Sequence, residues 1–130
     1  MKVGSICYAT SRGLGHLCKS FFDHKIITDV MVVRHGSVPT HDDWYPGSTQ
    51  ITSLRNAIQQ QWMMDFCKSC DAMLFFETPF VWELLPYCKT IGVRTYLMTM
   101  YECTPKMSPR PHRYICPSLL DMKYFPSGVH

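Results

Sequence analysis

The sequence has no long hydrophobic run. None of its apolar stretches approaches the roughly 18 consecutive residues that a transmembrane helix requires. It also lacks a signal-peptide pattern, because a single lysine near the N-terminus is followed at once by a strand-like segment. No internal repeat, low-complexity tract or linker divides the 130 residues. These absences predict one cytoplasmic domain over residues 1–130, without a membrane span.

Clustered basic charge is scarce. The formal net charge is only +3, and most lysines and arginines are scattered along the chain. Only Lys106, Arg110 and Arg113 lie near one another. Nucleic-acid-binding domains usually carry a stronger basic stripe, so we expect no nucleic acid as a partner.

The cysteine pattern is incomplete for a metal site. Of seven cysteines, only Cys67 and Cys70 form a CxxC pair. No second pair and no spaced histidines supply the four ligands of a structural zinc ion. The CxxC pair also falls at the end of a predicted helix, whereas redox thiols are activated at the start of one. We therefore expect reduced, buried thiols and no metal.

Strand-like and helical segments alternate along the chain. The predicted strands are 2–8, 28–34, 71–77, 93–99 and 113–116, and the predicted helices are 14–24, 53–69, 79–91 and 119–124. Nearly continuous apolar strands are typical of a parallel sheet that is buried on both faces. The pattern predicts an α/β, Rossmann-like three-layer sandwich with a mainly parallel five-stranded sheet, in the order 3-2-1-4-5.

Several residues mark the expected ends of the helices. Thr52 or Ser53 is expected to cap the second helix, Thr78 the third and Ser118 the fourth. Pro86 lies inside the third predicted helix, where it is expected to kink or shorten it.

The turn after the first predicted strand contains Gly13-Leu14-Gly15 and leads into a helix. Such glycines allow a ligand to approach the backbone, and the helix N-terminus attracts negative charge. The turn lacks the third glycine of a dinucleotide-binding motif, because position 18 is Cys18, and it lacks the Gly-Lys-Ser/Thr ending of a P-loop. A tight turn that needs positive φ would select the same glycines without any ligand.

Polar residues follow several predicted strands, and the ends of parallel strands converge on one crevice. Histidines and carboxylates there are candidates for a general base or for hydroxyl binding, and arginines for binding an anionic group. Structural roles are open for the same residues, since Glu77 would also favour a helix N-terminus and Arg34 would suit a solvated loop. The candidate residues are His16 as a catalytic base, Thr10, Arg12, Gly13, Gly15, Arg34, His35, Glu77, Tyr101 and Glu102 as substrate-binding residues, and Ser118 at the last strand end.

Segments 3–15, 35–47, 75–80 and 116–118 resemble the N-terminal domain of GT-B-type glycosyltransferases, as does 125–128. The resemblance implies two Rossmann-like domains that face a cleft, with the sugar or other hydroxyl acceptor bound by the N-terminal one. A nucleotide-sugar donor would be bound by a second domain or chain, and no metal or other cofactor is implied. His16 matches the position of a histidine that deprotonates the acceptor hydroxyl in several such families.

The donor-binding glutamate and the phosphate-holding residues of that family have no counterpart in this sequence. The resemblance therefore predicts an acceptor-binding domain of a hexosyltransferase-like enzyme, either a fragment or a separate chain, that is inactive alone. Its uncovered cleft face would favour docking or homo-oligomer formation. Two alternatives stay open: a non-catalytic interaction module on the same scaffold, and a small nucleotide-binding, flavodoxin-like protein.

Overall fold

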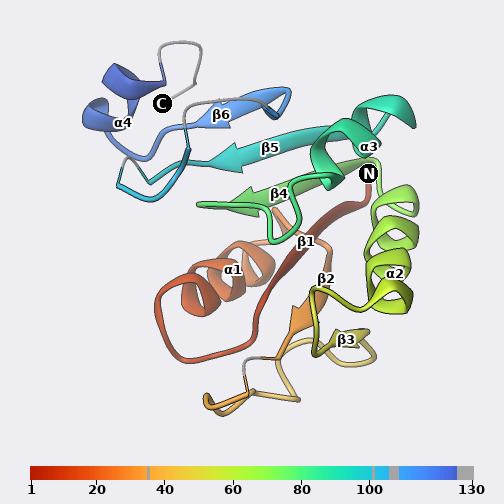
Figure 1. Ribbon diagram of the computed structural model, residues 1–130. Coiled ribbons are helices and arrows are strands. Elements are labelled where there is room, and N and C mark those ends of the chain that lie inside the picture. The colour runs from red at the N-terminus through yellow and green to blue at the C-terminus, as the bar shows by residue number, and fades with distance from the viewer. Residues whose placement is uncertain (35, 101, 106–108, 126–130) are drawn as a thin grey trace.

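The computed structural model describes residues 1–34, 36–100, 102–105 and 109–125. Within these ranges six strands form one sheet in which every pairing is parallel, with four helices around it (Figure 1). The elements are β1 (Val3–Tyr8), α1 (Gly13–Asp23), β2 (Asp29–Val33), β3 (Gln50–Ile51), α2 (Ala57–Lys68), β4 (Ala72–Phe76), α3 (Leu84–Thr90), β5 (Arg94–Met98), β6 (Arg113–Ile115) and α4 (Leu119–Tyr124). The predicted α/β, Rossmann-like fold with a parallel sheet is confirmed.

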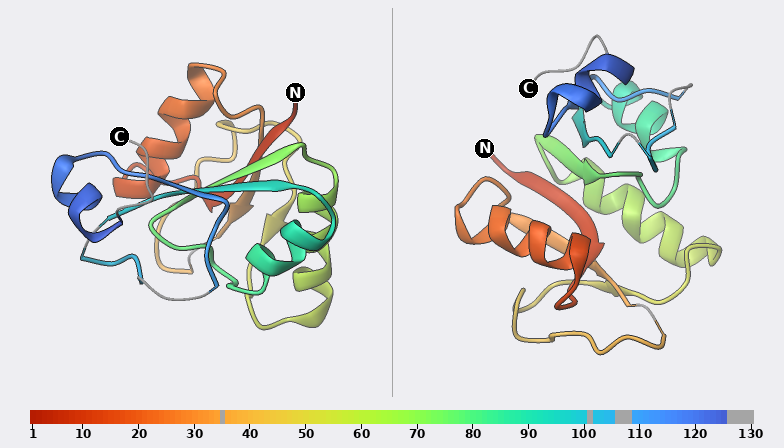
Figure 2. Two further views of the ribbon diagram at one scale, coloured as in Figure 1. Left: turned by 90° about the horizontal axis from the view of Figure 1, so that it is seen from above. Right: turned by 90° about the vertical axis from the view of Figure 1, so that its left-hand side faces the viewer.

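The sheet separates two hydrophobic cores, because side chains of a strand alternate between its faces. In β4 every residue is buried: Met73 and Phe75 pack into one core, and Leu74 and Phe76 into the other. The first core also contains side chains of α2 and α3, and the second contains those of α1. Figure 2 shows α1 and α2 on opposite sides of the sheet. This double burial explains why the strands read as continuous apolar runs.

The strand order is β3-β2-β1-β4-β5-β6. The numerical order recurs with one strand more, but the predicted placement of 71–77 at the edge beside 28–34 is wrong. The strand at that edge is the short Gln50–Ile51, which pairs with β2. The segment 71–77, which the prediction counted as the third strand, is the fourth and pairs with β1. Two residues inside a long polar loop are too short to give a strand pattern, so the sequence did not reveal β3.

Two of the four helices begin later than predicted. α2 starts at Ala57 and is capped by Asn56, whose Oδ1 accepts hydrogen bonds from the backbone N–H groups of Ile58 (2.9 Å) and Gln59 (3.1 Å). The predicted caps Thr52 and Ser53 are wrong. Their backbone N–H groups instead donate to Oε1 of Gln59, both at 2.8 Å.

The third helix is also shorter than predicted. α3 spans only Leu84–Thr90, so Thr78 and Pro79 lie before it rather than at its N-terminus. Pro86 is the third residue of α3, in the first turn, where its missing N–H has no helical partner to lose. At this position it removes no helical hydrogen bond, and the first half of the predicted helix is absent because α3 begins at Leu84. Ser118 caps α4 as predicted and accepts from the backbone N–H of Asp121 at 3.2 Å.

Candidate functional site

The carboxyl ends of the parallel strands share one edge of the sheet, and α4 lies at the side to which β4, β5 and β6 point (Figure 1). Gly13 follows β1, Glu77 follows β4 directly, and Glu102 follows β5 after three residues. The three candidate residues therefore belong to the same edge, as the sequence predicted. Open α/β sheets bind ligands at this edge.

The turn between β1 and α1 depends on two glycines in different ways. Gly13 has φ +34°, a conformation that residues with a Cβ rarely adopt. Gly15 is buried because the chain doubles back on it: a Cβ there would lie 2.1 Å from the carbonyl oxygen of Thr10. Its backbone N–H donates to the Arg12 carbonyl at 2.8 Å. Gly15 is thus needed for the close packing of the turn against α1, and Gly13 for the positive φ of the turn.

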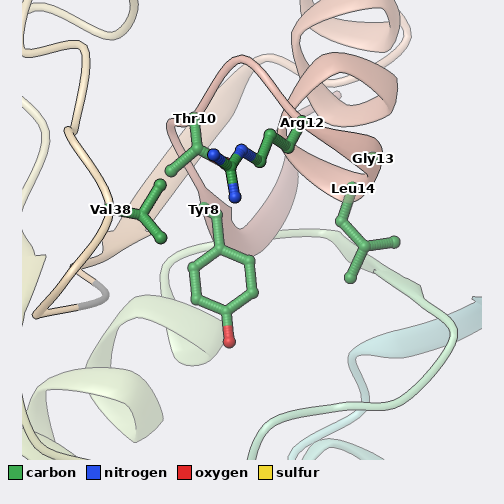
Figure 3. A pocket seen from close by; sticks show the side chains of 6 residues that line it. All are labelled: Tyr8, Thr10, Arg12, Gly13, Leu14 and Val38. Carbon is green, nitrogen blue, oxygen red and sulfur yellow. The ribbon is translucent and has the colours of Figure 1, made fainter.

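A cavity of about 310 Å³ lies beside this turn (Figure 3). Its lining residues are Tyr8, Thr10, Arg12, Gly13, Leu14 and Val38. The Arg12 guanidinium lies beside Thr10, at the backbone end of the Tyr8 side chain, with Val38 and Leu14 on opposite sides (Figure 3). The structure thus brings three of the candidate residues, Thr10, Arg12 and Gly13, together at one cavity.

The apolar walls of the cavity were missed by the sequence analysis. Tyr8 is the last residue of β1, and its ring packs edge-on against Phe80 with centroids 5.1 Å apart. Val38 belongs to the loop after β2, and Leu14 to the first turn of α1. Only the length of the loop after β2 gave a signal, because long loops in compact domains often carry function.

Glu77 stands out at the end of β4. Its φ is +61°, which is uncommon for a residue with a Cβ and is shared only by Lys25 among the described non-glycine residues. Such conformations occur at turns and at functional sites. Its backbone is fixed on both sides, since its N–H donates to the Met98 carbonyl (2.8 Å) and its carbonyl accepts from Thr104 Oγ1 (2.6 Å). The half-buried side chain has no hydrogen bond or ion pair to any other residue that the structure describes.

Burial raises the pKa of the Glu77 carboxyl above its ordinary value. A carboxylate that is partly removed from water and held on a strained strand end is suited to accept a proton or a hydroxyl hydrogen bond. Thr104, which is buried, ties the loop after β5 to this point, whereas the Glu102 side chain in the same loop is exposed.

Arg34 already has partners within the chain. Its Nη1 donates to Asp42 Oδ1 at 2.8 Å and to Gln50 Oε1 at 2.6 Å. Hydrogen bonds from Gln50 and Arg34, together with the arginine charge, lower the pKa of the Asp42 carboxyl. Arg34 therefore links the loop after β2 to β3, a structural role that the sequence analysis left open.

His16 is exposed on α1 and lies outside the residues that line the cavity. Its ring lies 5.9 Å from that of Trp44. The His41 ring also stacks on Trp44, at 4.4 Å with the planes 7° apart. His41 Nε2 also forms a hydrogen bond with Ser11 Oγ, and the His41 N–H donates to the Ala9 carbonyl at 2.8 Å. These contacts hold the loop after β2 against the β1–α1 turn.

The remaining candidates divide into two groups. Ser118 is engaged as the cap of α4, and its hydroxyl and that of Thr99 both donate to the buried carboxylate of Asp121. His35 and Tyr101 lie outside the described residues, so their part in the site stays a prediction.

Among the residues that the structure describes, no group of three or more histidine, cysteine, aspartate or glutamate side chains is placed to hold a metal ion. Likewise, no helix within the described ranges is long and apolar enough to cross a membrane.

The fold and this edge define a Rossmann-like α/β domain with an all-parallel sheet. Searches against protein-family models, curated proteins and solved structures found no match to the chain.

Proposed function

We propose that this chain is the acceptor-binding domain of a GT-B-type glycosyltransferase. The observation that carries the proposal is the cavity at the carboxyl end of β1, which is built directly on the glycine turn that supports the family resemblance. The cavity lies at the edge where parallel α/β sheets bind small molecules. The fold alone would not support the proposal, because the same scaffold carries many unrelated functions.

In this proposal the residues of the cavity hold the acceptor. Tyr8, Leu14 and Val38 supply apolar contact, and Thr10 and Arg12 supply polar contact. Gly13 and Gly15 shape the turn so that the acceptor reaches the backbone. Arg34, His35, Tyr101 and Glu102 are proposed as further substrate-binding residues, as the sequence predicts.

The acceptor hydroxyl must lose a proton during transfer, and two groups at this edge are suited to take it. His16 is the base that the family resemblance implies. Glu77 is favoured by its half-buried, unpaired carboxylate and its raised pKa. We retain His16 as the proposed base, with Glu77 as a hydroxyl-binding group. The donor, a nucleotide sugar, is supplied by a second domain or chain.

Ligand-observed NMR on the purified chain tests the proposal. The probes are monosaccharides, disaccharides and hydroxylated aromatic compounds as acceptors, with UDP-glucose and GDP-mannose as donors. We expect at least one acceptor probe to bind and neither donor to bind. Val38→Trp fills the cavity and should weaken acceptor binding at least tenfold. Ile58→Trp, on the exposed side of α2, is the control and should leave binding unchanged.

His16→Ala provides a second control within the same experiment. Because His16 does not line the cavity, its loss should leave acceptor affinity within about twofold of the wild-type chain. Failure of every acceptor probe to bind would reject the proposal. Binding of a nucleotide in the cavity would instead favour the nucleotide-binding alternative.

One observation favours an interaction module as the second candidate. α4, at the carboxyl edge, exposes three large apolar side chains within six residues: Leu119 (76%), Leu120 (43%) and Tyr124 (41%). Exposed apolar clusters often mark contacts with other proteins. Sedimentation of the wild-type chain and of Leu119→Ser/Leu120→Ser distinguishes the two candidates. A dimer that the double variant dissociates, without any acceptor binding, would favour the interaction module.

A further inference from the structure

We infer that the cavity selects an acceptor whose bound part is an apolar or aromatic ring carrying one anionic group. This inference rests on the proposed function and names the substrate class for the same cavity. It comes from the chemistry of the lining residues rather than from the family resemblance.

The first argument is the composition of the cavity wall. Tyr8, Leu14 and Val38 present an aromatic ring and two branched aliphatic side chains, and no lining residue has a carboxylate or amide side chain. Neutral sugars are rich in hydroxyl groups, each of which needs donors and acceptors when removed from water. This wall offers such a ligand few partners. It offers a ring both an aromatic face and aliphatic contact.

The second argument is the charge of Arg12. Among the described residues no ion pair to its guanidinium is found, and no acidic residue lies in the first turn of α1. The nearby loop after β2 contains Asp42 and Asp43. The Asp42 carboxylate is already bound to Arg34 and Gln50, and no ion pair joins Asp43 to Arg12 among the described residues. Arg12 therefore brings a positive charge to the cavity without an acidic partner from these elements.

An anion on the ligand would complete this arrangement. A guanidinium binds a carboxylate or a phosphate with two parallel hydrogen bonds, and such bonds are stronger than neutral ones. In Figure 3 the Arg12 guanidinium lies beside Thr10, at the backbone end of the Tyr8 side chain and between Val38 and Leu14. An anion bound there would direct its attached ring toward Tyr8, Leu14 and Val38, which line the same cavity. The cavity volume of about 310 Å³ limits the bound part to a small ring system.

The experiment measures binding of four probes by two-dimensional NMR titration of the full chain. The anionic probes are 4-hydroxybenzoate and phenyl phosphate, which distinguish a carboxylate from a phosphate. The neutral probe is 4-hydroxybenzyl alcohol, which has nearly the same size and shape as 4-hydroxybenzoate. UDP is the fourth probe, because its binding would indicate that Arg12 holds the phosphate of the donor rather than an anion of the acceptor.

We expect at least one anionic probe to bind at least tenfold more tightly than the neutral alcohol. Arg12→Gln should remove that difference, and Arg12→Lys should retain part of it because the charge remains. Arg55→Gln, which removes an exposed arginine before α2, is the matched control and should change nothing. Raising the salt concentration should weaken binding of the anionic probes and leave binding of the alcohol unchanged.

The contrary outcomes separate the inference from the proposed function. If the alcohol binds as tightly as the anions and Val38→Trp abolishes both, the cavity is an acceptor site and the inference is wrong. If UDP binds with the Arg12 dependence, the inference is also wrong, because the anion belongs to the donor. The inference is also wrong if no probe binds, or if Val38→Trp leaves anion binding intact. The proposed function is then decided separately, by whether uncharged acceptors bind.

Discussion

Gly15 lies directly against the backbone of Thr10. A Cβ on Gly15 would come within 2.1 Å of the Thr10 carbonyl oxygen and within 2.8 Å of its nitrogen. No rotation of a side chain relieves these contacts, since both atoms belong to the backbone. The close approach brings Thr10 to the N-terminal turn of α1 and so gives the cavity its shape.

Gly15→Ala should therefore destabilise the chain and distort the cavity. Overpacking of a tightly packed position typically costs about 1–3 kcal/mol of unfolding free energy. Urea denaturation followed by circular dichroism measures the loss. Gly36→Ala is the control, because a Cβ on Gly36 meets no atom within 4 Å. Equal stability of the two variants would contradict the packing role of Gly15.

Asn56 is the cap of α2, and its replacement tests the corrected helix start. Asn56→Ala removes the acceptor for the N–H groups of Ile58 and Gln59, which should cost about 1 kcal/mol. Ser53→Ala should stay within about 0.5 kcal/mol, because the exposed Ser53 does not cap the helix. Chemical denaturation of both variants provides the comparison. A larger loss for Ser53→Ala would restore the start predicted from the sequence.

Glu77→Gln should stabilise the chain at neutral pH. Because burial raises the pKa of the Glu77 carboxyl, the folded state binds its proton more tightly than the unfolded state. Stability from this group is therefore fully present below the unfolded pKa of about 4.3 and is lost as the pH rises through the folded pKa. The variant has no such loss, so its advantage should appear above that range and vanish below about pH 4.

Thermal denaturation from pH 3 to pH 8 checks this dependence. Glu102→Gln is the control, since it removes an exposed carboxylate from the same edge of the sheet. A Glu77→Gln variant whose melting temperature is lower than that of the wild-type chain at pH 7 would show that the charged form is stabilised by a partner.

Cys103 should be the fastest of the seven thiols to react. It is exposed, whereas Cys7, Cys18, Cys67, Cys70, Cys88 and Cys116 are buried. Burial also raises the pKa of the Cys70 and Cys116 thiols, which lowers their thiolate fraction. Iodoacetamide at pH 7.5, followed by mass spectrometry, should label one site rapidly, and Cys103→Ser should remove that phase. Rapid labelling of another cysteine in folded protein would disprove the expectation.

The fold was largely predictable, because double burial of the strands leaves a direct trace in the sequence. β4 shows this best, with five consecutive buried apolar residues. β3 was not predictable, because its two residues pair with β2 only after the loop has been folded back. The start of α2 was misplaced because Thr52 and Ser53 are residue types that often cap helices. In the structure they lie before the helix, and their backbone N–H groups donate to the Gln59 side chain.

The candidate site was predictable only in part. Topology alone placed Thr10, Arg12 and Gly13 at the carboxyl edge, and the structure joins them at one cavity. Val38 could not be found, because nothing in the sequence of a long loop tells which residue turns back onto β1. The conformation of Glu77 was equally hidden, since a positive φ is expected at glycine and not at glutamate.

The purified chain alone should show no measurable glycosyl transfer. Bringing two reactants into register lowers a barrier by roughly 7–11 kcal/mol, and this contribution is lost when one reactant stays free in solution. The cavity has room for one small ligand, the proposed acceptor. A donor free in solution would reach that bound acceptor only by collision. His16 as a general base would add a factor on the order of 10²–10⁴, far less than alignment supplies. Incubation of the chain with a bound acceptor and a radiolabelled nucleotide sugar measures the product. Turnover that His16→Ala abolishes would mean that this domain also binds the donor.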